Sequence, residues 1–253
     1  MRVAVVGGTG VLGARVVAEL AARGDDVRVL SRGPRQSRVD AEIEHRPVDL
    51  ASGEGLAEAV AGTEVVIDAA NALRQAKQVL VEGTGRLLAA EAEAGVAHHV
   101  AISIVGCDRV PTSYYATKVA QEGAVEAGTV PWSLIRATQF HQLIAGAFAS
   151  AARFRVAPTG AALLQPIEPG AVARRVADLA HAGPSGRVGD VGGPELLSLT
   201  ELSATWRRHA AHRLLPLRVP MLGRLGRSLR DGGLCNREAA VESKTFDRWL
   251  ADE

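Results

Sequence analysis

The chain has little of several residue types, and each scarcity excludes a class of protein. Its 253 residues include only two cysteines, Cys107 and Cys235, too few for a disulfide framework and without the spacing of a metal site. The net charge of +1 lacks the bias typical of proteins that bind nucleic acids. The first residues enter a glycine loop after an apolar run too short for a signal peptide or a membrane span. We therefore expect a cytoplasmic protein that acts on a small molecule, with no nucleic acid, membrane or metal partner.

The chain does have a regular alternation of short β-branched segments and longer amphipathic ones. With 47% apolar residues, it can fill the core of one large α/β domain. The predicted strands cover residues 2–6, 26–30, 43–48, 64–68, 98–103 and 132–136, and the clearest predicted helices cover 11–23 and 76–94. Right-handed crossovers then predict a doubly wound parallel sheet, a Rossmann-like α/β fold with helices on both faces.

After residue 136, prolines interrupt this alternation. We expect a single domain over residues 1–253, in which residues from about 158 to 253 contribute a small lobe that covers the substrate. Between residues 207 and 230 this lobe carries seven arginines, with leucine and valine interleaved. The pattern is typical of a solvated helix face, on which arginine stems cover an apolar stripe. A lid that binds anions or faces lipid is the alternative.

A glycine-rich loop joins the first predicted strand to the helix that follows it, with the sequence Gly7-Gly8-Thr9-Gly10-Val11-Leu12-Gly13. In this setting glycines permit a tight turn, a close approach of backbone to a pyrophosphate, and close packing of helix on strand. The unpaired N–H groups and positive dipole end of the helix attract phosphate. The loop therefore predicts dinucleotide binding. The contacts are expected from Gly7, Thr9, Gly10, Val11, Leu12 and Gly13.

The end of the second predicted strand indicates which dinucleotide is bound. About 20 positions after such a glycine loop, NAD-binding proteins usually have an acidic residue that accepts from the ribose 2′-hydroxyl. This chain has Ser31-Arg32-Gly33-Pro34-Arg35 there, and a guanidinium suits the 2′-phosphate of NADP. We therefore expect NADP as the cofactor, with contacts from Ser31, Arg32 and Arg35, and NAD as the alternative. The other expected cofactor contacts are Asp49, Ala69, Ala70, Asn71 and Lys118.

The scarcity of tyrosine and lysine singles out one segment. The chain has two tyrosines and three lysines, and three of these five side chains fall in Tyr114-Tyr115-Ala116-Thr117-Lys118. In a helix, Tyr114 and Lys118 lie one turn apart on the same face, and a nearby ammonium lowers the pKa of a phenol from its usual value of about 10. Such a phenol can donate or accept a proton. A half-buried ring beside a solvated charge is the structural alternative.

Together with residues 99–106 and 134–141, these segments resemble the short-chain dehydrogenase/reductase superfamily, specifically its atypical NmrA-like branch of NAD(P)-binding proteins. The similarity covers nearly the whole chain. It implies that Tyr114 exchanges a proton with the substrate oxygen, that Ser103 hydrogen-bonds this oxygen, and that Lys118 holds the nicotinamide ribose. The residues that it places around the substrate are Tyr115, Gln139, Phe140 and His141. For the histidine, a hydrogen-bonded residue at a helix start is an equal alternative.

The resemblance implies an NADP-dependent oxidoreductase that transfers a hydride between the nicotinamide and a carbonyl or alcohol of a small, partly apolar molecule. Two alternatives stay open. Many NmrA-like proteins have lost the tyrosine and lysine and bind the nucleotide without turnover, which would suit a regulator that senses NADP. An isomerase, epimerase or dehydratase would use the same cofactor without net oxidation. The composition suits a bacterial source, and helices beside a sheet often pair in this superfamily, so a homodimer is also open.

Overall fold

The computed structural model describes residues 1–33, 43–210, 213–241 and 243–252. Contacts divide the chain into two compact units. Unit 1 comprises Met1–Ser103, Ala116–Ile135 and Val172–Val188, and unit 2 comprises Ile104–Tyr115, Arg136–Ala171 and Gly189–Glu253. Unit 2 thus includes segments that precede residue 158, where the lobe is expected to begin. The prediction of a single domain with one appended lobe stays a prediction.

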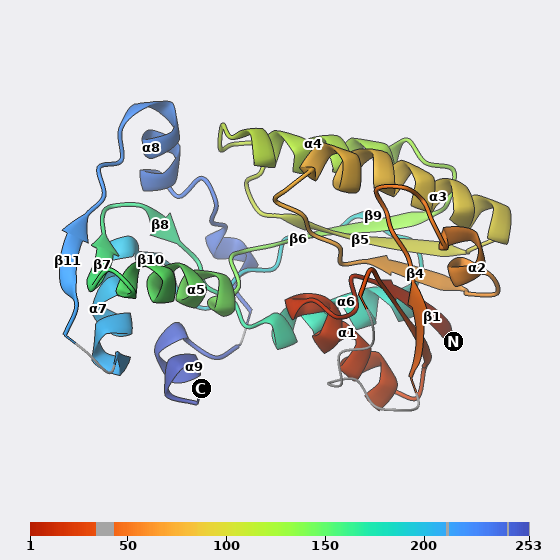
Figure 1. Ribbon diagram of the computed structural model, residues 1–253, viewed down its shortest axis with the longest axis horizontal. Coiled ribbons are helices and arrows are strands. Elements are labelled where there is room, and N and C mark those ends of the chain that lie inside the picture. The colour runs from red at the N-terminus through yellow and green to blue at the C-terminus, as the bar shows by residue number, and fades with distance from the viewer. Residues whose placement is uncertain (34–42, 211–212, 242, 253) are drawn as a thin grey trace. The chain divides into compact units, whose positions relative to one another are not determined.

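A parallel sheet forms the centre of unit 1 (Figure 1). Its strands are β1 (Arg2–Val6), β2 (Asp26–Ser31), β3 (Glu44–Pro47), β4 (Val65–Asp68), β5 (His98–Ile104), β6 (Trp132–Ala137) and β9 (Gly186–Arg187), in the order β3-β2-β1-β4-β5-β6-β9. The predicted α/β Rossmann-like class is confirmed. Each predicted strand agrees with an observed one to within about one residue at either end. The apolar strands β1 and β4 lie at the centre, as expected for strands buried on both faces.

Helices cover both faces of this sheet (Figure 1). On one face lie α1 (Val11–Ala22) and α6 (Pro169–Ala182), and on the other lie α3 (Gly83–Ala94) and α4 (Ser113–Glu126), with the short α2 (Leu56–Val60) beside α3. The apolar stripe predicted for the first helix faces inward, since Leu12, Val16, Val17 and Leu20 are buried. None of the helices in the described part of the chain is long and apolar enough to cross a membrane.

The helix predicted over residues 76–94 is two elements. A π-helix, η1 (Lys77–Glu82), leads directly into α3. Gly83, at the junction, packs so closely that a Cβ would lie 2.8 Å from the carbonyl oxygen of Leu50. A π turn contains one more residue than an α turn and frequently occurs at functional sites. Hydrophobic periodicity does not reveal it, because the change in register is confined to one turn.

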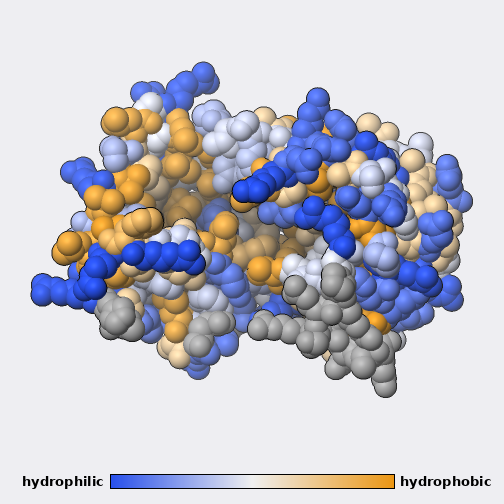
Figure 2. Space-filling view, in the orientation of Figure 1, coloured by the Kyte–Doolittle hydropathy of each residue, from blue (hydrophilic) through white to orange (hydrophobic). Residues whose placement is uncertain are grey.

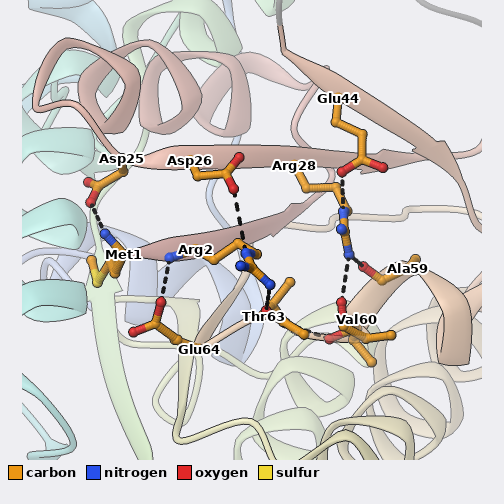
Figure 3. Close-up of polar contacts among 12 residues, drawn as sticks. Met1, Arg2, Asp25, Asp26, Arg28, Glu44, Ala59, Val60, Thr63 and Glu64 are labelled. Carbon is orange, nitrogen blue, oxygen red and sulfur yellow. Dashed lines mark hydrogen bonds and ion pairs between the residues drawn. The ribbon is translucent and has the colours of Figure 1, made fainter.

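Charged side chains close the amino edge of the sheet, where the parallel strands begin (Figure 3). The amino group of Met1 lies 3.1 Å from Asp25. The guanidinium of Arg28 lies 2.7 Å from Glu44 and also donates to the carbonyl oxygen of Ala59 at 2.7 Å. These side chains therefore pair with one another and with nearby backbone carbonyl groups at this edge.

Unit 2 has its own core, around which α5 (His141–Ala152), α7 (Leu199–His209) and α9 (Phe246–Ala251) pack. The core side chains are Ile144, Ala145, Phe148, Leu202, Phe246 and Trp249. Ser198 and Glu201 form a capping box at the start of α7, which satisfies two N–H groups reciprocally. The remaining elements are the antiparallel pair β8 (Leu163–Leu164) and β10 (Leu197–Ser198), the parallel pair β7 (Val156–Thr159) and β11 (Leu215–Arg218), α8 (Gly223–Arg230) and the 3-10 helix η2 (Arg237–Ala239).

Candidate functional site

The glycine loop lies at the carboxyl ends of β1 and β4. Gly7 has φ +70°, in the left-handed region that favours glycine, and a Cβ there would lie 3.0 Å from backbone atoms of Ala69 and Ala70. A Cβ on Gly13 would overlap with the carbonyl oxygen of Gly7. The glycines therefore make the tight turn and the close packing predicted for them, and they bring Ala69 and Ala70 beside the loop.

The N-terminus of α1 opens at this same edge. Its N-cap is Gly10, which has no side chain with which to cap the first N–H groups. Thr9, Gly10 and Val11 are exposed, whereas Leu12 is buried in the core. The strand order reverses between β1 and β4, and ligands of open α/β sheets bind outside the carboxyl ends at such a reversal. The backbone cradle and the dipole of α1 fit a pyrophosphate.

The residues predicted to contact the adenosine part of the cofactor include those at the end of β2. Ser31 is buried, and its hydroxyl lies 2.7 Å from Nε2 of His45. Arg32 is exposed, and Arg35 lies outside the described residues. Asp49 accepts a hydrogen bond from the backbone N–H of Ala51 at 2.8 Å and so holds the turn after β3. No local sequence feature marks His45, because only the pairing of β2 with β3 brings it to Ser31.

A buried polar network lies in unit 1 behind the ends of β4 and β5. Lys118 on α4 is 3% exposed. Its Nζ donates to the carbonyl oxygen of Ile102 at 3.0 Å and to Oε1 of Gln121 at 2.6 Å. The Gln121 amide in turn donates to Asp68 at 3.2 Å and to Thr84 at 3.1 Å. Because a buried ammonium is costly unless it is hydrogen-bonded, these contacts fix the position of Lys118.

Sequence reasoning found Lys118 but missed the three side chains around it. Gln121 follows Lys118 by three positions on one helix, a spacing that places both on the same face, so this partner was open to prediction. Asp68 and Thr84 come from β4 and α3. Only the packing of these elements brings them together, and the Thr84 hydroxyl donates to Asp68 at 3.3 Å.

The residues expected to be catalytic fall in both units. Ser103 is buried on β5, directly after Ile102, which accepts from Lys118. Unit 1 therefore brings Ser103 and Lys118 to the same strand end. Tyr114 and Tyr115 belong to unit 2, and the segment that carries both tyrosines and Lys118 is helical, as predicted. The two phenol rings are 5.5 Å apart. Burial raises the pKa of Tyr115, and Tyr114 raises it further, so Tyr115 gives up its proton less readily than an ordinary phenol.

The side chains predicted to line the substrate pocket have contacts within unit 2. Gln139 is buried, donates to the carbonyl oxygen of Leu234 at 2.9 Å, and accepts from the N–H of Gln165 at 3.0 Å. His141 is buried beside the rings of Phe246 and Trp249. Its Nε2 lies 3.0 Å from the carbonyl oxygen of Lys244, and burial lowers its pKa. These are contacts of core residues and give no support to substrate binding.

The other predicted residues are placed as follows. Phe140 is half-buried as the N-cap of α5, and Asn71 is exposed after β4. Cys107 and Cys235 are buried and form no disulfide, and burial raises the pKa of Cys235 to about 11. Among the residues that the structure describes, no three histidine, cysteine, aspartate or glutamate side chains gather in a way that could hold a metal ion.

A family model described as NAD(P)H-binding matches residues 7–181, which is more than half of the chain. The chain belongs to this NAD(P)H-binding family. The match begins at Gly7 and includes the glycine cradle, α1, Ser103 and Lys118. The cofactor is therefore NAD(P), and the tight glycine turn, with the exposed backbone of Thr9 and Gly10, fits the pyrophosphate of such a dinucleotide. No curated protein matches the sequence.

Solved structures of an oxidoreductase and of two epimerases share this fold. The NADPH-dependent quinone oxidoreductase of Escherichia coli, solved with NADPH, has a TM-score of 0.82 at 17% identity over 99% of both chains. A nucleoside-diphosphate-sugar epimerase of Staphylococcus aureus has a TM-score of 0.80 at 14% identity, again over 99% of both. The UDP-glucose 4-epimerase of Thermus thermophilus, solved with NAD, has a TM-score of 0.71 at 21% identity over 87% of this chain and 86% of its own. At these identities the likeness establishes the fold.

Proposed function

We propose that this NAD(P)H-binding protein is an NADP-dependent oxidoreductase of the short-chain dehydrogenase/reductase type, in its NmrA-like branch. The observation that carries the proposal is the position of Lys118. Its ammonium is buried, is held by Ile102 and Gln121, and lies on the helix that carries Tyr114 four positions earlier. Because burial of an ammonium opposes folding, its fixed position at the cofactor edge supports a role in binding or chemistry rather than in stability alone.

NADP is proposed over NAD because of the end of β2. Ser31 and the exposed Arg32 stand where NAD-binding proteins usually have a carboxylate. A planar guanidinium matches the 2′-phosphate, which NAD lacks. The similar oxidoreductase of E. coli is NADPH-dependent, which agrees with this choice.

The chain's own residues would act as follows in the reductive direction. Tyr114 donates a proton to the carbonyl oxygen of the substrate, and Ser103 donates a hydrogen bond to the same oxygen. Lys118 holds the ribose and stabilises the phenolate that Tyr114 becomes. The bound nicotinamide supplies the hydride. In the oxidative direction Tyr114 takes the proton back. The substrate is proposed to be a small, partly apolar carbonyl compound or alcohol.

The test is a turnover assay with NADPH and a panel of quinones, ketones and enones, followed by loss of nicotinamide absorbance. For a substrate that is turned over, Tyr114→Phe is expected to lower kcat by about 100-fold or more, the usual contribution of a general acid. Tyr115→Phe is the matched control and should keep kcat within a few-fold. Equal rates for wild type and Tyr114→Phe would remove the acid role. Tight NADPH binding without turnover of any compound would favour the regulator.

An epimerase is the second candidate, because two of the similar structures above are sugar-nucleotide epimerases. The same Tyr114 and Lys118 would then serve a transient hydride transfer. Incubation with NAD and UDP-glucose, followed by separation of the sugar nucleotides, distinguishes the two functions. An epimer formed without net change in nicotinamide absorbance would replace the oxidoreductase proposal.

A further inference from the structure

In unit 2, β11 and α8 carry exposed leucines and arginines together. Leu215 and Leu217 on β11, Leu222 before α8, and Leu225 on α8 are 65%, 54%, 79% and 40% exposed. We call residues 213–230 the basic apolar segment. Its arginines, all exposed, are Arg213, Arg218, Arg224, Arg227 and Arg230. Over β11 and α8, Figure 2 shows hydrophobic and hydrophilic side chains interspersed at the surface.

The exposed leucines of β11 share one face, because residues two apart on a strand point the same way. Among the described strands, β11 pairs only with β7, and all four of its residues are exposed. The N–H of Leu215 donates to the carbonyl oxygen of Arg155 at 2.9 Å. The residue before Arg155 is Phe154, another exposed apolar side chain. A further exposed apolar side chain therefore lies in the turn after α5, next in sequence to the residue that pairs with Leu215.

α8 also combines exposed leucine with exposed arginine, and it is an amphipathic helix. Arg224, Arg227 and Arg230 follow one another at intervals of three, which places them on one side of the helix. Gly226 anchors the helix, because a Cβ there would overlap with Met221. Ser228 adds a hydrogen bond to the carbonyl oxygen of Arg109 at 3.1 Å. The arginines are thus presented on a fixed element.

The positive charge of this segment is not neutralised within the described residues. The sequence has no Asp or Glu between Glu201 and Asp231. No ion pair among the described side chains involves Arg213, Arg218, Arg224 or Arg227, and the nearest pairs before the segment are those of Arg208 and His209 with Asp247. The positive charge therefore favours a partner with negative charge, and the exposed leucines favour a partner that also has an apolar surface.

We propose that the basic apolar segment docks on the surface of an anionic lipid bilayer. The interface of such a bilayer offers phosphate groups to the arginines and the acyl boundary to the leucines. Nucleic acid would match the charge but not the leucines. A symmetric contact with a second copy would bring two copies of the same positively charged surface together. The proposal departs from the expectation of no membrane partner, because the exposure of these leucines is visible only in the structure.

The experiment is flotation of the full-length protein with vesicles of phosphatidylcholine, alone or mixed with phosphatidylserine. Binding is expected only with phosphatidylserine and should weaken as salt is added. Replacing Arg224 and Arg227 by glutamine is expected to weaken binding about 25-fold, at about fivefold for each charge. Replacing Leu217 and Leu222 by serine should weaken it about tenfold or more. These side chains are exposed, so the fold is expected to persist, which circular dichroism checks.

The matched controls are Arg175→Gln on α6 and Leu143→Ser on α5, two exposed positions outside the segment. Both should bind vesicles as wild type does. The proposal is overturned if wild type does not float with anionic vesicles, or if the controls lose binding as strongly as the segment variants. It is also overturned if the arginine variant loses binding while the leucine variant keeps it, the result expected of a nucleic-acid surface. The assay contains no NADP, so its outcome is independent of the oxidoreductase proposal.

Discussion

The two edges of the parallel sheet in unit 1 use polar residues in opposite ways. At the amino edge, Arg2 pairs with Asp26 and Arg28 pairs with Glu44 (Figure 3), and the two carboxylate side chains are 73% and 39% exposed. At the carboxyl edge, Lys118 and Asp68 are buried and joined through Gln121. Exposed pairs contribute little to stability, whereas buried polar groups are costly whenever one partner is lost. The amino edge should therefore tolerate substitution, and the carboxyl edge should not.

A substitution in the glycine loop of the carboxyl edge is expected to cause the largest loss of NADPH affinity and of stability. In Gly13→Ala the new Cβ would overlap with the Gly7 carbonyl oxygen, so α1 must move away from β1. We expect NADPH affinity to fall about 100-fold or more, because the phosphate cradle is displaced, and the free energy of unfolding to fall by about 1–3 kcal/mol. Fluorescence titration with NADPH and urea unfolding measure the two quantities.

Gly123→Ala is the matched control, since this glycine of α4 has open space where its Cβ would lie. It should leave NADPH affinity unchanged and raise the unfolding free energy by about 0.5–1 kcal/mol through helix propensity. Unchanged NADPH affinity in Gly13→Ala would mean that the cofactor does not use this loop.

The glycine loop was predictable because its signals are local. The spacing of Gly7, Gly10 and Gly13, the apolar strand before them and the periodic helix behind them all fall within residues 1–23. Alternation of short apolar runs with amphipathic ones likewise predicted the strands of the sheet. The π turn before α3 and the division of the chain into two units were not predicted. Both depend on contacts between segments far apart in sequence.

The candidate site was predicted only in part, because it also depends on contacts between segments far apart in sequence. Tyr114 and Lys118 stood out because their residue types are rare in this chain. Asp68 was read as the end of a strand and Thr84 as part of a helix, since neither position has a local feature that marks a buried polar contact. His141 matched a family pattern, yet its ring packs in the core of unit 2. Sequence pattern gives the position of a residue on its element but not the partner of its side chain.

A smaller effect is expected from Gln121→Leu, which removes the link between Lys118 and Asp68. Both charged groups would lose a buried partner, so the free energy of unfolding should fall by about 1–3 kcal/mol. If the link also positions Lys118 for the cofactor, NADPH affinity should fall about tenfold, whereas Gln121→Glu, which can still accept from Lys118, should restore part of it. A drop in stability alone, with unchanged NADPH affinity in both variants, would assign the network a purely structural role.

The smallest effect is expected at the amino edge, in Glu44→Gln. The hydrogen bond from Arg28 holds the pKa of Glu44 below its ordinary value of 4.5, with help from Arg46. A carboxyl with a lowered folded pKa stabilises the protein above its unfolded pKa, and this contribution disappears as the pH falls through the folded value. Because the side chain is 39% exposed, solvent screening limits the contribution to about 0.2–1 kcal/mol. Urea unfolding of both proteins should show this difference at about pH 7 and almost none below about pH 3. NADPH affinity should not change, and a tenfold loss there would show that the two edges are coupled rather than independent.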